Sequence, residues 1–169
     1  MIKGSTKIHA VLFLANVILI AAGWISALYA YPRLPPQMPL WLNFLSQDVL
    51  KNNRSLLFFI YPSAQFLFSL AFFLLWKSVR YRHLFFGEEL KSLSGEKKDR
   101  ILDLEQEFLW LSLIFFNMIF IHIQTSLILL SRQASQGINE FYFSGLFGIL
   151  LMLIPYYRIK RKLVLKKTL

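Results

Sequence analysis

Four long apolar runs alternate with polar segments along this chain of 169 residues. The runs cover about residues 8–30, 55–76, 108–130 and 141–157. A helix that crosses the hydrocarbon core of a bilayer needs about 20 apolar residues, and roughly 17 are enough where the bilayer is thin. The pattern therefore predicts an all-α fold, a single domain in which four transmembrane helices form a polytopic membrane protein.

The longest polar segment, residues 77–107, divides the four runs into two pairs. It carries seven Lys and Arg, and the tail at residues 158–169 carries six more. Together with the first seven residues, these segments hold 15 of the 19 Lys and Arg, whereas the loops on the opposite side hold four. Basic segments stay in the cytoplasm during membrane insertion. The charges therefore predict that both termini and the central loop lie in the cytoplasm.

The loop between the first two runs is rich in proline, with four prolines within eight residues: Pro32, Pro35, Pro36 and Pro39. Proline lacks a backbone donor and fixes φ, so we expect an extended, polyproline-like segment rather than a helix. The apolar residues that follow are expected at the bilayer surface: Trp41, Leu42, Phe44 and Leu45. Residues 99–107 mix apolar and acidic residues, which predicts a helix that continues directly into the third span.

The composition fits a membrane protein better than a soluble one. Hydrophobic residues make up 56% of the chain and charged residues 17%, less than the usual quarter of a soluble domain. The net charge of +10 lies beside the apolar runs, which favours anionic lipids rather than nucleic acid as partners. Six basic residues of the tail are expected to contact anionic lipid: Arg158, Lys160, Arg161, Lys162, Lys166 and Lys167. The absence of cysteine rules out disulfides and thiolate metal sites.

Four polar residues interrupt the predicted spans: Asn16, Gln65, Asn117 and His122, with Gln124 nearby. Polar side chains in lipid are unfavourable unless they face partners. The helical rise places the first three at similar depths, roughly 10–16 Å from the cytoplasmic end. We therefore expect them to meet between the first three helices. Two roles stay open: hydrogen bonds that hold the helices together, at about 0.6 kcal/mol or somewhat more each, or a polar substrate site.

The sequence predicts neither a cofactor nor catalysis. A six-coordinate haem on His122 needs a second axial ligand, but His9 lies about 20 Å away along the membrane normal and Met118 is on the same helix. The spans contain no Asp, Glu, Lys or Arg, which argues against an ion or proton pump. Hydrolase, metalloprotease, phosphate-loop and dinucleotide motifs are absent from the sequence. We expect a protein without enzymatic activity, bound cofactor or metal.

The proline-rich loop resembles a membrane domain of unknown function found at the N-terminus of SdpI-type bacteriocin-immunity proteins. The family pattern is Tyr-x-x-Leu-Pro-x-x-x-Pro-x-His-x-Asn-x-x-Gly, and this chain matches it at Tyr31, Leu34, Pro35, Pro39 and Asn43. Trp41 stands at the position of the family's histidine and Ser46 at that of its glycine. The resemblance covers about residues 10–76 and implies a multi-span protein of a bacterial inner membrane, with toxin immunity or signalling as the family's best-known roles.

These features together predict a binding or accessory function. The chain is expected to be a small integral membrane protein that packs against other membrane protein subunits or against itself, since its Phe-rich spans offer apolar surface. The alternatives are a carrier or membrane enzyme that uses the polar residues in the spans, and an immunity protein of the SdpI type. An internal cavity that reaches one membrane face would favour a carrier or enzyme, whereas a packed interior would favour the accessory role.

Overall fold

Four long helices dominate the computed structural model, which describes residues 3–39, 51–82, 95–132 and 139–166. They are α1 (Lys3–Ala30), α2 (Ile60–Arg82), α3 (Gly95–Ser131) and α4 (Glu140–Lys166). All four are long and apolar enough to cross a membrane. The predicted all-α, four-helix membrane fold is therefore confirmed, and the chain is a multi-pass membrane protein.

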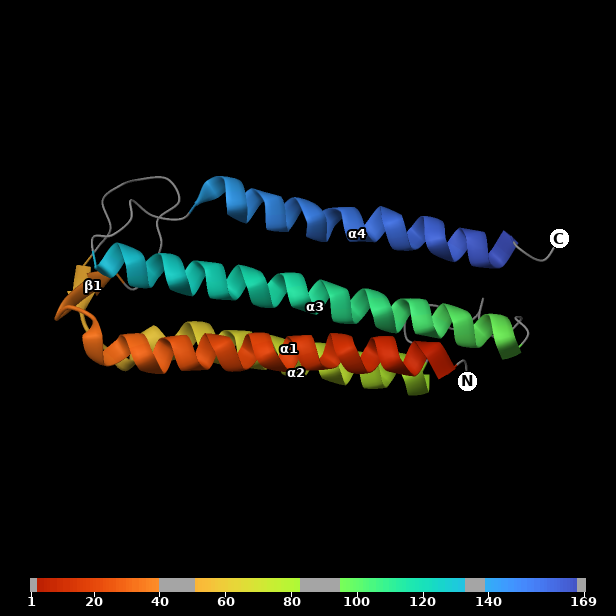
Figure 1. Ribbon diagram of the computed structural model, residues 1–169, viewed down its shortest axis with the longest axis horizontal. Helices are drawn as coiled ribbons and strands as arrows, with labels where there is room; N and C mark the ends of the chain where they lie inside the picture. The colour runs from red at the N-terminus through yellow and green to blue at the C-terminus, as the bar shows by residue number, and fades with distance from the viewer. Residues whose placement is uncertain (1–2, 40–50, 83–94, 133–138, 167–169) are drawn as a thin grey trace.

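The third helix is the centre of the bundle. Helices α1 and α2 pack against each other and against one side of α3, while α4 packs against α3 on the side away from α1 and α2. Figure 1 shows both chain termini at one end of the bundle. We call this the basic end, because residues 95–107 and 158–166 lie there, and we call the opposite end, with residues 30–39 and 51–59, the loop end.

The helices extend beyond the apolar runs at the basic end. Helix α3 begins at Gly95, with Glu96 in its first turn, where a negative charge stabilises the helix dipole. The prediction that residues 99–107 continue into the third span is confirmed. The described part of the basic tail is helical as well, because α4 continues without a break through Lys166. Lysine, arginine and leucine favour a helix, so the change from apolar to basic residues does not end it.

A small folded cap covers the loop end. Strands β1 (Gln37–Pro39) and β2 (Lys51–Asn53) pair antiparallel, with Gln37 opposite Asn53. Two 3₁₀ turns flank this ribbon, η1 (Tyr31–Arg33) and η2 (Leu56–Phe59), so the expectation of a wholly non-helical loop was wrong at its start. Proline near the start of η1 supplies the φ that such a turn needs. The predicted surface residues Trp41, Leu42, Phe44 and Leu45 lie outside the described residues.

Arg54 joins the two sides of the cap. Its backbone N–H donates to Pro36 O at 2.7 Å, and its Nη1 atom donates to Pro32 O at 3.3 Å and to Leu34 O at 3.2 Å. Beneath it lies a buried apolar cluster of Ala27, Leu34, Met38 and Phe58. The Tyr31 ring packs on Phe58, with ring centroids 6.0 Å apart. Tyr31 and Leu34, two residues of the family-like loop pattern, therefore have a packing role here.

Candidate functional site

A triad of polar side chains joins the first three helices in the middle of the bundle. Asn117 of α3 donates from Nδ2 to Asn16 Oδ1 of α1 at 2.9 Å, and it accepts a hydrogen bond from the Ser69 hydroxyl of α2 at 3.1 Å. The Asn16 amide donates to Leu12 O at 2.9 Å and to Trp110 O at 3.2 Å. Because Asn16 and Asn117 are 2% and 1% exposed, these bonds satisfy groups that neither water nor lipid can reach.

A second polar layer lies nearer the loop end. Gln124 of α3 donates from Nε2 to Gly23 O at 2.9 Å and to Ser26 Oγ at 3.0 Å, both on α1. Gln65 of α2 donates to Leu19 O at 3.3 Å. A Cβ atom at position 23 would clash with Gln65 Oε1, so a larger residue there would require the Gln65 amide of α2 to move away from α1. We call Asn16, Gln65, Ser69, Asn117 and Gln124 the polar ladder.

The structure places the polar residues of the spans in two groups. Asn16 and Asn117 contact each other directly, while Gln65 lies in the neighbouring layer and is bonded to neither. His122 does not join the ladder, because its ring packs against Tyr142 of α4 with centroids 4.7 Å apart. At about 100° per residue, His122 is rotated roughly 140° from Asn117 around α3, whereas Gln124 returns to the same face. Similar depth in the membrane is therefore not enough for two polar residues to meet, because their side chains must also point in the same direction around the helix.

The polar ladder offers little chemistry beyond holding helices together. Its amides and hydroxyl donate to one another and to backbone carbonyls, and it contains no ionisable group. One polar atom of the ladder is left unsatisfied, because Gln65 Oε1 is buried without a hydrogen-bond partner among the described residues. Within these residues no group of three or more His, Asp and Glu could hold a metal ion. The arrangement is that of a packed interface between helices.

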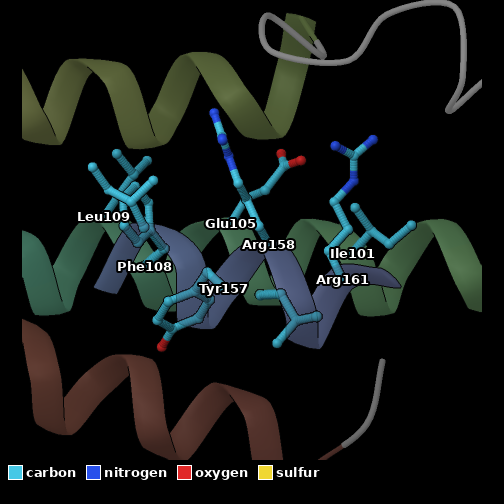
Figure 2. Close-up of a pocket in the computed structure, with 9 residues that line it drawn as sticks. Ile101, Glu105, Phe108, Leu109, Tyr157, Arg158 and Arg161 are labelled. Atoms are coloured by element: carbon cyan, nitrogen blue, oxygen red, sulfur yellow. The ribbon is translucent and has the colours of Figure 1, made fainter. Parts of the chain in front are cut away.

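A pocket of about 380 Å³ lies between α3 and α4 at the basic end. Its walls are mainly apolar and its charged residues come from both helices: Ile101, Leu104, Glu105, Phe108, Leu109, Ile154, Tyr157, Arg158 and Arg161. In Figure 2 the carboxylate of Glu105 and the guanidinium groups of Arg158 and Arg161 point to the same side of the two packed helices. The Tyr157 hydroxyl points to the opposite side. The volume falls within the roughly 300–1,000 Å³ of small-molecule sites.

Glu105 is the unusual residue of this pocket. Both of its carboxylate oxygens are buried and have no hydrogen-bond partner in the described part of the chain. Burial raises the pKa of Glu105 to about 7, and the positive charge of Arg161 partly opposes that shift. A buried carboxylate beside an arginine but without hydrogen bonds is only partly compensated. Sequence reasoning missed this residue, because acids among the basic residues of the loop looked like a simple charge offset.

The six basic residues expected at anionic lipid differ in their surroundings. Lys160 turns toward α3, where its Nζ atom lies 3.2 Å from Glu107 Oε2 and within 5.4 Å of the Tyr157 ring centroid. Arg158 and Arg161 line the pocket. Lys162 and Lys166 are exposed on the helical extension of α4, and Lys167 lies outside the described residues.

Comparison with known proteins gives no match to this chain, whether among family models, curated proteins or solved structures.

Proposed function

We propose that this chain is an accessory protein of a bacterial inner membrane, and that it binds another membrane protein through α4. Both termini and the basic end then lie in the cytoplasm, as the 15 Lys and Arg on that side favour. In this proposal α1, α2 and α3 form the scaffold, because the polar ladder joins them with hydrogen bonds from all three helices. Helix α4, which packs against α3 on the outside, is the part presented to the partner.

One face of α4 supports this role. Residues three or four positions apart form a continuous line along the helix, which we call the α4 stripe: Phe141, Gly145, Gly148, Met152, Tyr156, Ile159 and Leu163. Its large side chains are between 55% and 91% exposed. No described atom lies within 4 Å of a Cβ built at either glycine, so this face has room for a close neighbour. Small residues flanked by large apolar ones are typical of surfaces where membrane helices pack together.

The observation that carries the proposal is the part of the stripe beyond the apolar span. Ile159 and Leu163 are each 59% exposed, and they lie among Arg158, Arg161 and Lys162. Lipid tails cover apolar side chains fully inside the hydrocarbon core, but less completely at its surface, where the basic residues lie. A helix that runs alongside α4 would cover both residues. Since this end of α4 is strongly basic, the complementary partner carries acidic residues there, and a parallel second copy would bring like charges together.

The test of this proposal is co-purification from native membranes. We expect one membrane protein to be recovered with the chain, and about tenfold less of it with Ile159→Ser or Leu163→Ser. Burying one such side chain contributes about 1.5–3 kcal/mol, and about 1.4 kcal/mol corresponds to a factor of ten in affinity. Ile8→Ser is the matched control, because Ile8 is 53% exposed near the basic end of α1 and lies outside the stripe.

Two results would contradict the proposal. Equal recovery of the same protein with all three variants would show that the stripe does not bind it. A second copy of the chain as the partner, recognised by two different tags, would show that the stripe serves self-association instead.

A further inference from the structure

The pocket between α3 and α4 lies where both helices change from apolar to charged residues. On α3 the apolar run begins at Phe108, and Glu105 stands one turn before it. On α4 the apolar run ends at Tyr157, and Arg158 follows directly. The phosphates and headgroups of a bilayer occupy the layer just outside its hydrocarbon core, which is about 30 Å thick. The charged part of the pocket therefore lies at the level of lipid headgroups, and the part lined by Phe108, Leu109 and Ile154 lies at the level of acyl chains.

The charged groups of the pocket define the ligand that it fits. Two guanidinium groups, those of Arg158 and Arg161, point to the same side as the carboxylate of Glu105 (Figure 2). Guanidinium groups bind phosphate oxygens through paired hydrogen bonds. The carboxylate oxygens of Glu105 need donors, since none of the described residues supplies one. A ligand that matches this set carries a phosphate and, close to it, a cationic group with N–H donors.

We propose that the α3–α4 pocket binds one phospholipid with an ethanolamine headgroup, whose phosphate lies against Arg158 and Arg161 and whose primary ammonium donates to Glu105. The acyl chains then run along the apolar wall formed by Phe108 and Ile154. Basic pockets between transmembrane helices at this level commonly hold lipid headgroups. This proposal requires the membrane placement of the helices but no partner protein.

The carboxylate makes the pocket selective. A glycerol headgroup brings the same phosphate but no cation, so it supplies no ammonium donor to the Glu105 oxygens and adds a negative charge beside them. A choline headgroup brings a cation without N–H donors, so the carboxylate oxygens stay without hydrogen bonds. The ethanolamine headgroup alone among these three provides both the charge and the donors. Arg161 already interacts with Glu105, so its positive charge offsets part of the repulsion between the carboxylate and the phosphate.

The experiment is native mass spectrometry of the detergent-solubilised protein mixed with equal amounts of phosphatidylethanolamine, phosphatidylglycerol and phosphatidylcholine. We expect one ethanolamine lipid to bind about tenfold more tightly than either competitor, as one charge-assisted hydrogen-bonded contact predicts. Glu105→Gln should remove this preference without weakening the glycerol lipid. Arg158→Gln should weaken all three lipids, because each of them carries the phosphate.

Matched controls come from an exposed ion pair on α3, the helix that carries Glu105. Arg100 and Glu96 lie 2.8 Å apart near the start of α3, and neither lines the pocket. Glu96→Gln and Arg100→Gln repeat the charge changes of the test variants, and they should leave lipid selectivity unchanged. Equal effects from the control and test variants would show that only net charge matters, and would overturn the proposal.

Other outcomes are equally informative. Preference for the glycerol lipid in the wild-type protein would make the site an anionic-lipid site and contradict the role of Glu105. Glycerophosphoethanolamine, which has the headgroup without acyl chains, should compete only at about tenfold or higher concentration. If it competes as well as the lipid, the apolar wall has no role and the ligand is a soluble phosphate compound instead.

Discussion

Replacing Gly23 by valine should destabilise the folded protein by about 1–3 kcal/mol, the usual effect of overpacking a well-packed interior. The added side chain would enter the space of the Gln65 amide, which approaches the Gly23 backbone from α2. It would displace the hydrogen bond from Gln65 to Leu19 O and push α1 away from Gln124 of α3. Valine also favours a helix slightly more than glycine does, so a loss of stability reports the clash and not helix propensity. Equilibrium unfolding in mixed micelles measures the change.

The control for this variant is Gly148→Val, because a Cβ at Gly148 meets no described atom within 4 Å. We expect it to change stability by less than about 0.5 kcal/mol. Gln65→Ala in the Gly23→Val background should recover part of the loss, since it removes the atoms that clash. Equal destabilisation by the two valine variants, or no recovery in the double variant, would contradict the close approach of α1 and α2 at Gly23.

Replacing Asn117 by leucine should cost about 1–2 kcal/mol of stability. Asn117 is the one residue of the polar ladder that bonds to side chains on two other helices, Asn16 and Ser69. Hydrogen bonds between membrane helices contribute about 0.6 kcal/mol on average and about 1.7 at most, so two of them predict this range. The variant also leaves Asn16 Oδ1 buried without its donor.

A double-mutant cycle separates these contributions. Asn16→Ala and Asn117→Leu together should destabilise less than the sum of the single variants, because either one breaks the same bond. His122→Phe serves as the control within α3. His122 Nε2 is buried without a hydrogen-bond partner in the described residues, so its removal should not lower stability. Strict additivity of the Asn16 and Asn117 effects would contradict the direct bond between them.

The order of residues along the chain predicts some features of this fold and not others. Hydropathy located all four helices, because a bilayer imposes a minimum apolar length on every span. Depth along the helix grouped Asn16, Gln65 and Asn117, of which Asn16 and Asn117 bond directly while Gln65 bonds to Leu19 O instead. Ser69 was missed, although it lies four residues after Gln65 on the same face, because serine is too common in apolar helices to signal a contact.

Contacts at the ends of the helices were harder to predict. The pairing of Lys160 with Glu107 depends on how α4 packs along α3, which neither residue reveals in the sequence. The burial of the Glu105 carboxylate oxygens without hydrogen-bond partners likewise depends on the apolar residues of α4 that pack near them. The ribbon of β1 and β2 joins segments separated by a long stretch of chain, and Arg54 holds them through backbone carbonyls that carry no sequence signal.

Binding of a partner by α4 and of a lipid in the α3–α4 pocket both require that the four helices cross the membrane with the basic end in the cytoplasm. The natural sequence has no cysteine, so single cysteines can report each side without background. Gln37 is exposed at the loop end, and the side chain of Glu96 is 74% exposed at the basic end. In intact cells a membrane-impermeant maleimide should label Gln37→Cys and leave Glu96→Cys unlabelled, and both should react once the membrane is permeabilised. Labelling of Glu96→Cys in intact cells, with Gln37→Cys protected until permeabilisation, would reverse the orientation and contradict the account.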